Sequence, residues 1–355
     1  MTPFSFIIVC FLYFFGLILF YITYLTKQRN EKRAFINNLV NSIIFTSSIT
    51  INLFIIYIRN PNKVRFIAFP FDILMLLFII FFIPLFSFLV IKEKRKIENG
   101  KITFEEFKSS SKVLPLKYDI YRKLTHLVVL GIIFFYFTLG FLVQNVFKYI
   151  SELLPNFIVE MFDMGDDIMV FTQNLVVFLV GVSLIGLLTA DFIRILKPKY
   201  YPLKPVNQIL KEKELYMRLG PHISMSIGCF SIILLYGLIQ PVGPLIICTS
   251  MAMAIFGDTA SNLFGRTLGK RKIRDTDKTY EGLVAGVVIA FISGFTVLLS
   301  LKKFYFPKNF GLFYLPLLGS IILGFIDYLD LEIDDNLSYN FILSTVLFFC
   351  SVLLF

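Results

Sequence analysis

The sequence is poor in charged residues, has only two histidines and contains no tryptophan. Lys, Arg, Asp and Glu make up 16% of its 355 residues, whereas soluble domains contain roughly 25%. With 57% hydrophobic residues and 43 phenylalanines, this deficit excludes an ordinary water-soluble domain. The four cysteines, Cys10, Cys229, Cys248 and Cys350, all lie in apolar runs and form no C-x-x-C pair. They are typical of small apolar side chains and exclude a disulfide framework or a thiolate metal site.

Long apolar runs recur along the chain, each of a length that can cross roughly 30 Å of hydrocarbon. We count about ten, at 4–26, 35–58, 66–91, 124–143, 168–193, 222–240, 243–262, 281–301, 311–329 and 339–355. The sequence therefore predicts an all-α, polytopic membrane helix bundle. The first run lacks a basic leader and is too long for a typical signal peptide, so we expect it to be retained as a span.

The net charge of +10 is carried mainly by loops between the apolar runs. Loops 92–123, 194–218 and 265–280 are basic, whereas loop 148–167 is acidic. The positive-inside rule places the basic loops on the cytoplasmic side and explains the charge without a nucleic-acid partner. Because successive spans cross the membrane in opposite directions, loops alternate between its two faces. By this alternation the cations of residues 59–65 lie on the opposite side and are an exception to the rule. We expect an integral, multi-pass protein of the endoplasmic reticulum if eukaryotic, or of the cell membrane if prokaryotic.

Two parts of the chain are expected to differ in role. Residues 1–117 contain three spans and end in a mixed segment, 93–118, which has the pattern of an interfacial amphipathic helix. Residues 118–355 are expected to form a seven-span catalytic core, because the polar clusters lie at the ends of its spans. These clusters are at 121–126, 191–194, 257–286 and 327–336. All four fall on the cytoplasmic face by parity, and charge at the edge of a membrane bundle usually serves a function.

The richest cluster reads GDTASNLFGRTLGKRKIRDTDKTYEGLVAG over residues 257–286. In a helix, Asp258, Asn262 and Arg266 would share one face. Asp258 and Asn262 could share a hydrated Mg²⁺, and Arg266 could reach a phosphate oxygen. The basic run Lys270 to Lys272 follows Gly265 and Gly269 and could hold a polyphosphate, or equally anionic lipid headgroups.

The same stretch ends with Lys278, Thr279 and Glu281 in front of an apolar run. Thr279 is a candidate helix N-cap, which would place Glu281 in the first turn, where the helix dipole favours a carboxylate. That structural role competes with metal binding or with fixing Lys278. Gly282 and Gly286 form a G-x-x-x-G pair, which is typical of close helix packing.

Two smaller clusters belong to helix ends. Arg122, Lys123 and His126 share one side of a helix start, where the cations could contact a ligand or anchor the span at the headgroups. His126 lies one turn inside, where a neutral imidazole could orient a phosphate or a hydroxyl group. Asp191 and Arg194 are spaced for a local ion pair.

The last cluster is acidic and lies between two apolar runs. It contains Asp327, Asp330, Glu332, Asp334, Asp335 and Asn336. Phosphate and its metal ion need a basic and an acidic group side by side, and this loop supplies the acidic one. The alternative interpretation is a solvated acidic turn.

In this order the clusters resemble the CTP-dependent lipid kinase family, which includes dolichol kinase, phytol kinase and yeast-type diacylglycerol kinase. That family is distantly related to CTP:phosphatidate cytidylyltransferases. The resemblance covers about residues 118 to 355 and rests on R-K-x-x-H, D-x-x-R, the long 257–286 signature and D-D-N-L at 334–337. Asp191 and Asp327 stand where the family more often has Glu, and the proline that commonly follows D-D-N-L is absent.

The resemblance implies transfer of the γ-phosphoryl group of CTP to a lipid alcohol at the cytoplasmic face. A polyprenol such as dolichol is the first choice, with diacylglycerol or phytol next. Phosphoryl transfer depends mainly on positioning and charge neutralisation, which these residues can supply. We expect Asp258, Asp335 and Asn336 to bind Mg²⁺, with Asp334 or His126 accepting the proton and Glu281 assisting. The expected CTP contacts are Arg122, Lys123, Asn262, Arg266, Lys270, Lys272, Lys278 and Thr279.

Two alternatives stay open. A CTP:phosphatidate cytidylyltransferase would share the membrane, CTP and Mg²⁺, but those enzymes usually end in a K-D-x-x-x-x-x-P-G-H-G-G-type motif, which this chain lacks. A non-catalytic transporter or scaffold would also explain the spans. Transporters, however, tend to place polar residues near the middle of the membrane at broken helices, whereas the clusters here lie at one edge.

Overall fold

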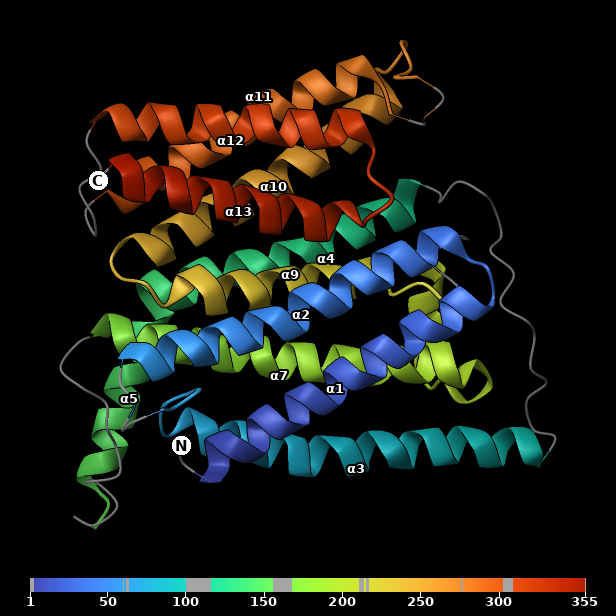
Figure 1. The fold of residues 1–355 in the computed structure, drawn as a ribbon, viewed down its shortest axis with the longest axis vertical. Helices are drawn as coiled ribbons and strands as arrows, with labels where there is room; N and C mark the ends of the chain where they lie inside the picture. The colour runs from blue at the N-terminus through green and yellow to red at the C-terminus, as the bar shows by residue number, and fades with distance from the viewer. Residues whose placement is uncertain are drawn as a thin grey trace.

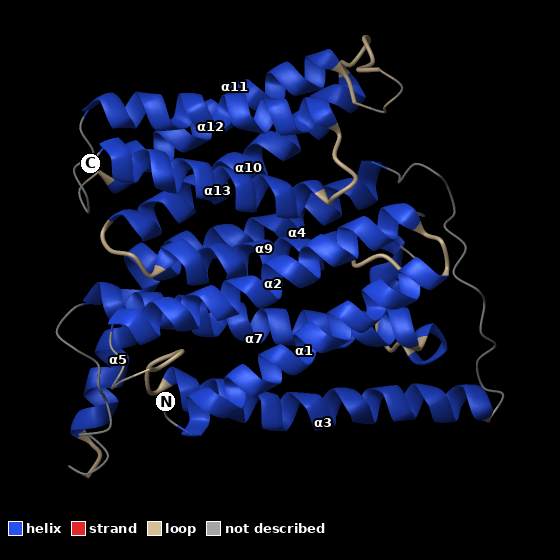
Figure 2. Cartoon of the chain, viewed as in Figure 1, coloured by secondary structure: helices blue, strands red, loops and turns tan. Residues whose placement is uncertain are grey.

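The computed structural model describes residues 3–59, 61, 64–99, 116–155, 168–210, 214, 217–274, 276, 278–302 and 309–354. Over these residues the chain is an all-α, multi-pass membrane bundle (Figure 1). Figure 2 shows its helices joined by loops, and the described part contains no strand beyond one β-bridge, Lys272 to Thr279. The predicted fold class is confirmed. Most of segment 93–118 lies outside the described residues.

The long helices are α1 (Pro3–Gln28), α2 (Lys32–Arg59), α3 (Phe71–Glu98), α4 (Leu116–Phe134), α5 (Gly140–Glu152), α7 (Ile168–Leu196), α9 (Pro221–Ile232), α10 (Val242–Thr267), α11 (Tyr280–Leu301), α12 (Asn309–Leu329) and α13 (Asp335–Leu354). A π-helical segment, η1 (Phe135–Leu139), joins α4 to α5, and another, η4 (Ile233–Gly237), continues α9. Two short 3₁₀ helices, η2 (Pro198–Tyr200) and η3 (Lys204–Ile209), follow α7.

Nine of the helical segments within the described residues are long and apolar enough to cross a membrane. The tenth predicted span, 222–240, is shorter: it is α9 with η4, 12 and 5 residues, which together reach only about 25 Å. Helices α2, α7 and α13 pack around it (Figure 1). Every side chain of α9 except His222 and Ser226 is buried.

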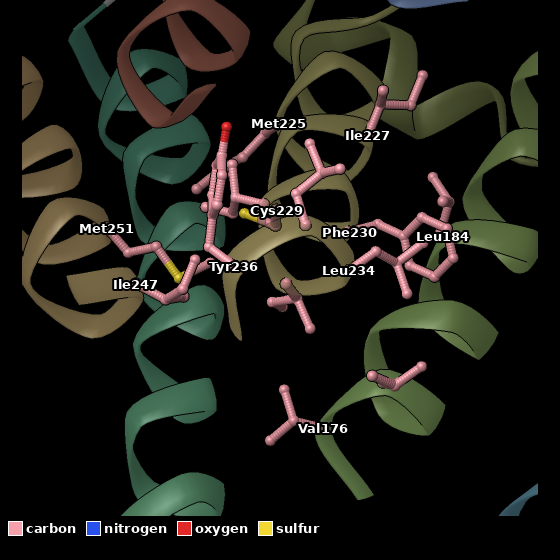
Figure 3. Close-up of a cluster of buried hydrophobic side chains, with 14 of the residues drawn as sticks. Val176, Leu184, Met225, Ile227, Cys229, Phe230, Leu234, Tyr236, Ile247 and Met251 are labelled. Atoms are coloured by element: carbon pink, nitrogen blue, oxygen red, sulfur yellow. The ribbon is translucent and has the colours of Figure 1, made fainter. Parts of the chain in front are cut away.

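The apolar core lies around α9 (Figure 3). Phe230 is fully buried, and its ring lies 6.1 Å from that of Phe45 on α2. Cys229 is buried on the same helix and packs there as a small apolar side chain. Figure 3 also shows Met225, Leu234, Tyr236, Ile247, Met251, Val176 and Leu184 around these residues. This packing fixes α7, α10 and α13, which carry the polar clusters.

Buried polar side chains join α2 to α9. Asn41 donates to the hydroxyl of Ser224 at 3.2 Å, and Ser48 donates to Ser231 at 3.1 Å. Between membrane helices, where lipid is as apolar as the side chains, such hydrogen bonds take over part of the role of the hydrophobic effect. The first three helices are therefore tied to those that follow. The division of the chain at residues 117 and 118 stays a prediction.

Small residues let α10 and α11 cross closely. A Cβ atom on Gly282 would lie 2.6 Å from the carbonyl oxygen of Ser261, and one on Gly286 would lie 3.0 Å from the Cβ of Ser261. A Cβ on Gly257 would lie 3.3 Å from the carbonyl oxygen of Gly286. The packing role predicted for the G-x-x-x-G pair is confirmed. The crossing also sets the loop between α10 and α11 against the neighbouring helices.

All four predicted polar clusters lie at one end of the bundle, on the right in Figure 1. There α4, α11 and α13 begin and α7, α10 and α12 end. We call this the site end, and it holds Lys123, Arg194, Asp258, Lys278 and Asp334.

Candidate functional site

An ion pair between α4 and α10 lies at the centre of the site end. The ammonium group of Lys123 contacts one carboxylate oxygen of Asp258, and the two side chains are only 10% and 9% exposed. Asn262 donates to the other oxygen at 2.7 Å. Asp258 and Asn262 therefore share one helix face, as predicted, whereas Arg266 one turn later is exposed. A buried pair of this kind persists only when both charges are well coordinated.

His126 lies beside this ion pair, one turn after Lys123. Its side chain is 2% exposed, and Lys123, Asp258 and Asp334 all act on it electrostatically. Its Nε2 atom has no hydrogen-bond partner among the described residues. Buried polar nitrogens are normally satisfied in folded proteins. The imidazole is therefore placed where it could exchange a proton with a bound group.

Lys278 is surrounded by three carboxylates of the acidic cluster. Its ammonium nitrogen lies 2.9 Å from Asp327, 3.1 Å from Asp330 and 3.4 Å from Asp335. Burial alone would lower the pKa of Lys278, but the carboxylates of Asp335, Asp327 and Asp330 outweigh burial and raise the pKa above its ordinary value. The expected pairing of a basic and an acidic loop is thus present as direct ion pairs. The contact between Lys278 and phosphate stays a prediction.

Asp327 connects three helices at this point. Its carboxylate accepts hydrogen bonds from Ser261 on α10 at 2.7 Å and from Tyr339 on α13 at 2.9 Å. Ser261 and Tyr339 are not among the residues predicted from the sequence motifs. Their helical spacing could have identified them, because Ser261 follows Asp258 by three residues and Tyr339 follows Asp335 by four.

The D-D-N sequence forms the start of α13. Asp334 is 7% exposed and accepts from the backbone N–H of Asn336 at 3.0 Å and from its side chain at 2.7 Å. Asp334 therefore acts as a helix N-cap. The Asp335 side chain is 33% exposed, and the carboxylates of Asp258, Asp334 and Asp327 all act on it. The Lys123–Asp258 ion pair and the carboxylates around Lys278 thus belong to one electrostatic cluster.

The basic loop after α10 contains a small anion site that a carboxylate of the protein occupies. One oxygen of Glu281 accepts from the backbone N–H groups of Lys270 at 3.1 Å and Arg271 at 3.2 Å. Successive amides that converge on one oxygen form the nest expected for an anion. Glu281 lies in the first turn of α11, as predicted, and the side chains of Lys270 and Lys272 are exposed.

Thr279 has the predicted capping role. Its hydroxyl accepts from the backbone N–H of Gly282 at 3.2 Å, and its side chain is buried. The nearby glycines leave room for it, since a Cβ atom on Gly269 would lie 2.6 Å from the Thr279 hydroxyl. These glycines therefore allow the backbone to lie close to Thr279.

A second buried network holds the loop between α7 and α9. Arg194 pairs with Asp191 at 2.5 Å, which confirms the predicted local ion pair, and donates to the carbonyl oxygens of Glu214 at 2.9 Å and Arg218 at 2.8 Å. Glu214 in turn accepts from Arg122 at 3.5 Å. Glu214 is not among the predicted site residues, because the sequence of a strongly basic loop does not indicate which cation a single acid will pair with.

A metal ion at the site end would need ligands beyond the side chains of the protein. Within the described part of the chain, no group of three or more His, Cys, Asp or Glu side chains is arranged to hold a metal ion. Mg²⁺ commonly takes only one or two carboxylates and completes its coordination with water and phosphate oxygens. Asp258, Asp335 and Asn336 supply donors of this kind at the site end.

Comparisons with protein families, with curated proteins and with solved structures find no match to this chain. The resemblance drawn from its motifs therefore stays a prediction, and the argument for function depends on the geometry of the site end.

Proposed function

We propose that this protein is a membrane-embedded phosphotransferase that uses CTP and Mg²⁺ to phosphorylate a lipid alcohol at the cytoplasmic face. The observation that carries the proposal is the pairing of Lys123 and Lys278 with carboxylates of other segments at one end of a membrane bundle. Buried charges in membrane proteins usually serve a function. A lysine that is paired with a carboxylate can exchange that partner for a phosphate, while the carboxylate binds the metal ion. The total charge of the site then stays balanced.

The basic loop supports a polyphosphate donor. Lys270 and Lys272 are exposed next to backbone amides that already hold one carboxylate oxygen, that of Glu281. A phosphate oxygen has the same requirements as that carboxylate, namely backbone donors and nearby positive charge. The proposed donor is CTP, on the motif resemblance described above. The same loop would also attract anionic lipid headgroups, which a nucleotide-dependent assay separates from donor binding.

The edge of the site supports a lipid acceptor. Leu263, Phe264, Leu268 and Tyr280 flank the basic loop and are 43%, 40%, 59% and 46% exposed. Exposed apolar side chains next to cations are typical of the membrane interface, where a lipid hydroxyl group lies. A lipid alcohol could therefore reach the site while its chain stays in the bilayer. We propose a polyprenol first, and diacylglycerol or phytol next.

In this proposal Asp258, Asp335 and Asn336 hold Mg²⁺, which when bound neutralises part of the phosphate charge. Lys123 and Lys278 stabilise the charge that develops on the transferred group. Between the two candidate proton acceptors, His126 is favoured over Asp334. Asp334 already caps α13, whereas the Nε2 atom of His126 has no partner among the described residues.

The experiment that tests the proposal uses purified protein in lipid nanodiscs with Mg²⁺ and γ-³²P-labelled CTP. Separate reactions contain polyprenol, phytol, diacylglycerol or phosphatidate. We expect label in a lipid monophosphate, and the productive reaction identifies the alcohol. Pyrophosphate release with phosphatidate alone would instead establish a cytidylyltransferase. No turnover in any reaction, with ATP also tested, would favour a transporter or scaffold.

A further inference from the structure

Two consecutive residues of α2 hold two loops that lie far away in the sequence. The side-chain oxygen of Asn37 accepts from the backbone N–H of Asp334 at 2.9 Å. The side chain of Asn38 accepts from the N–H of Leu219 at 3.0 Å and donates to the carbonyl oxygen of Met217 at 2.8 Å. Both asparagines are fully buried. Neighbouring residues on a helix point about 100° apart, which lets one turn of α2 hold two loops at once.

Both loops carry residues of the candidate site. Asp334 begins the turn that continues into Asp335 and Asn336. The loop at Met217 and Leu219 follows Glu214, whose carboxylate binds Arg122 next to Lys123. The positions of the acidic turn and of the basic start of α4 therefore both depend on contacts made by α2.

The choice of asparagine on α2 is difficult to explain by packing alone. Polar side chains inside a membrane bundle are expensive unless they are hydrogen-bonded. The amide nitrogen of Asn37 has no partner within the described residues. The hydrogen bond that its oxygen accepts from Asp334 therefore has to offset the cost of burying this side chain. An apolar side chain of similar size would avoid that unsatisfied donor.

We propose that Asn37 and Asn38 are positioning residues, which fix the acidic turn and the 217–219 loop relative to each other. In this way α2, which lies outside the motif resemblance, takes part in forming the site. The contacts themselves are tested without any activity. Their consequence for phosphoryl transfer rests on the proposed function.

Hydrogen exchange measures the contacts directly, because each asparagine accepts from a single backbone amide of its loop. The variants are Asn37→Leu and Asn38→Leu in the full chain. The matched control is Asn52→Leu, on the same helix, where the side chain donates to the carbonyl oxygen of Leu234 at 2.8 Å. Asn37→Leu should speed exchange of the Asp334 amide about tenfold or more. Asn38→Leu should do the same for the Leu219 amide, and Asn52→Leu should change neither.

Steady-state kinetics then test the positioning role. We expect each of Asn37→Leu and Asn38→Leu to lower kcat at least about tenfold, because small displacements of reacting groups are costly. The KM for CTP should change less than about threefold, since the exposed basic loop stays intact. Asn52→Leu should retain both values within about twofold. Alanine variants at the same positions replace any leucine variant that does not insert.

The outcomes separate the two proposals. Unchanged exchange at both amides overturns the contacts, and changed exchange with kinetics equal to those of Asn52→Leu overturns the positioning role. If the wild-type protein transfers no phosphate while exchange responds as expected, the proposed function fails and the contacts stand.

Discussion

Asp258 has both carboxylate oxygens occupied, one by the Lys123 ammonium group and one by the Asn262 amide. Asp258→Asn keeps the shape of the side chain but removes the charge needed for a metal ion and for Lys123. We expect phosphoryl transfer to fall at least about 10²- to 10³-fold, as when a group that stabilises transition-state charge is removed. The labelled-CTP assay measures this change.

The control for that variant is Asp72→Asn. Asp72 is also buried, but it lies at the start of α3, at the opposite end of the bundle, where it accepts from the backbone N–H of Ile73. Its transfer rate should stay close to that of the wild type. Normal transfer by Asp258→Asn would remove Asp258 from the reaction.

Lys278 gives a prediction for stability. Removing one partner of a buried ion pair costs about 3–5 kcal/mol, and the Lys278 side chain is partly exposed at 21%. We therefore expect Lys278→Met to lower the free energy of unfolding by about 1–3 kcal/mol at neutral pH. Lys94→Met is the control, because Lys94 and Glu98 form an exposed pair, 50% and 56% exposed, worth at most about 1 kcal/mol.

The pH dependence of this effect follows from the raised pKa of Lys278. A raised lysine pKa stabilises the folded state at every pH below the unfolded value, roughly 10.4, and this contribution is lost as the pH rises through the folded value. The stability difference between wild type and Lys278→Met should thus be present at pH 7–9 and shrink in strongly alkaline solution. Thermal unfolding in detergent at several pH values measures it. A difference that grew above pH 11 would contradict the ion-pair assignment.

The candidate residues could be predicted from the sequence more readily than their partners. Helical spacing places Asp258 and Asn262 on one face, and the capping pattern places Thr279 and Glu281 at a helix start. The partner of Lys123 lies 135 residues away. By sequence alone, many loop cations could pair with Asp258. The packing of the whole bundle, and not the local sequence pattern, decides which of them does.

At the scale of helices, the crossing of α10 and α11 controls the distance between Asp258 and Lys278. A methyl group on Gly282 would meet two backbone atoms, the carbonyl oxygen of Ser261 at 2.6 Å and the Cα of Gly265 at 2.9 Å. Backbone cannot move aside as a flexible side chain does. We expect Gly282→Ala to destabilise the protein by about 1–3 kcal/mol and to reduce transfer.

Gly131→Ala is the matched control for the crossing. Gly131 lies in α4, and a Cβ atom there would meet nothing within 4 Å. Alanine is a better helix former than glycine by up to about 1 kcal/mol. The two substitutions should therefore change the melting temperature in opposite directions. Equal effects would mean that the crossing has room for a side chain.

Helix length separates one of the ten predicted spans from the other nine. Nine helices within the described residues have the length and apolar composition to cross a membrane, and one of them, α10, is largely enclosed by protein. Residues 222–240 also read as a span, and the helical segment at that place, Pro221–Gly237, is shorter than the other nine. Apolar composition is the same in both cases. It reports burial, and only the packing around a helix distinguishes burial in lipid from burial in protein.

Charge is distributed unevenly between the two ends of the bundle, and this predicts an orientation in the membrane. The site end contains the basic loops after α7 and α10 and the basic end of α3, whereas α5 ends on the opposite side (Figure 1). The positive-inside rule therefore predicts that the site end faces the cytoplasm, where nucleotides are available. We expect Lys270→Cys, at an exposed position of the site end, to react with a membrane-impermeant maleimide only from the cytoplasmic side. Lys148→Cys, exposed on α5, should react only from the other side. The reverse pattern in sealed vesicles would place the site away from cytoplasmic CTP, and both the orientation and the proposed donor would then be wrong.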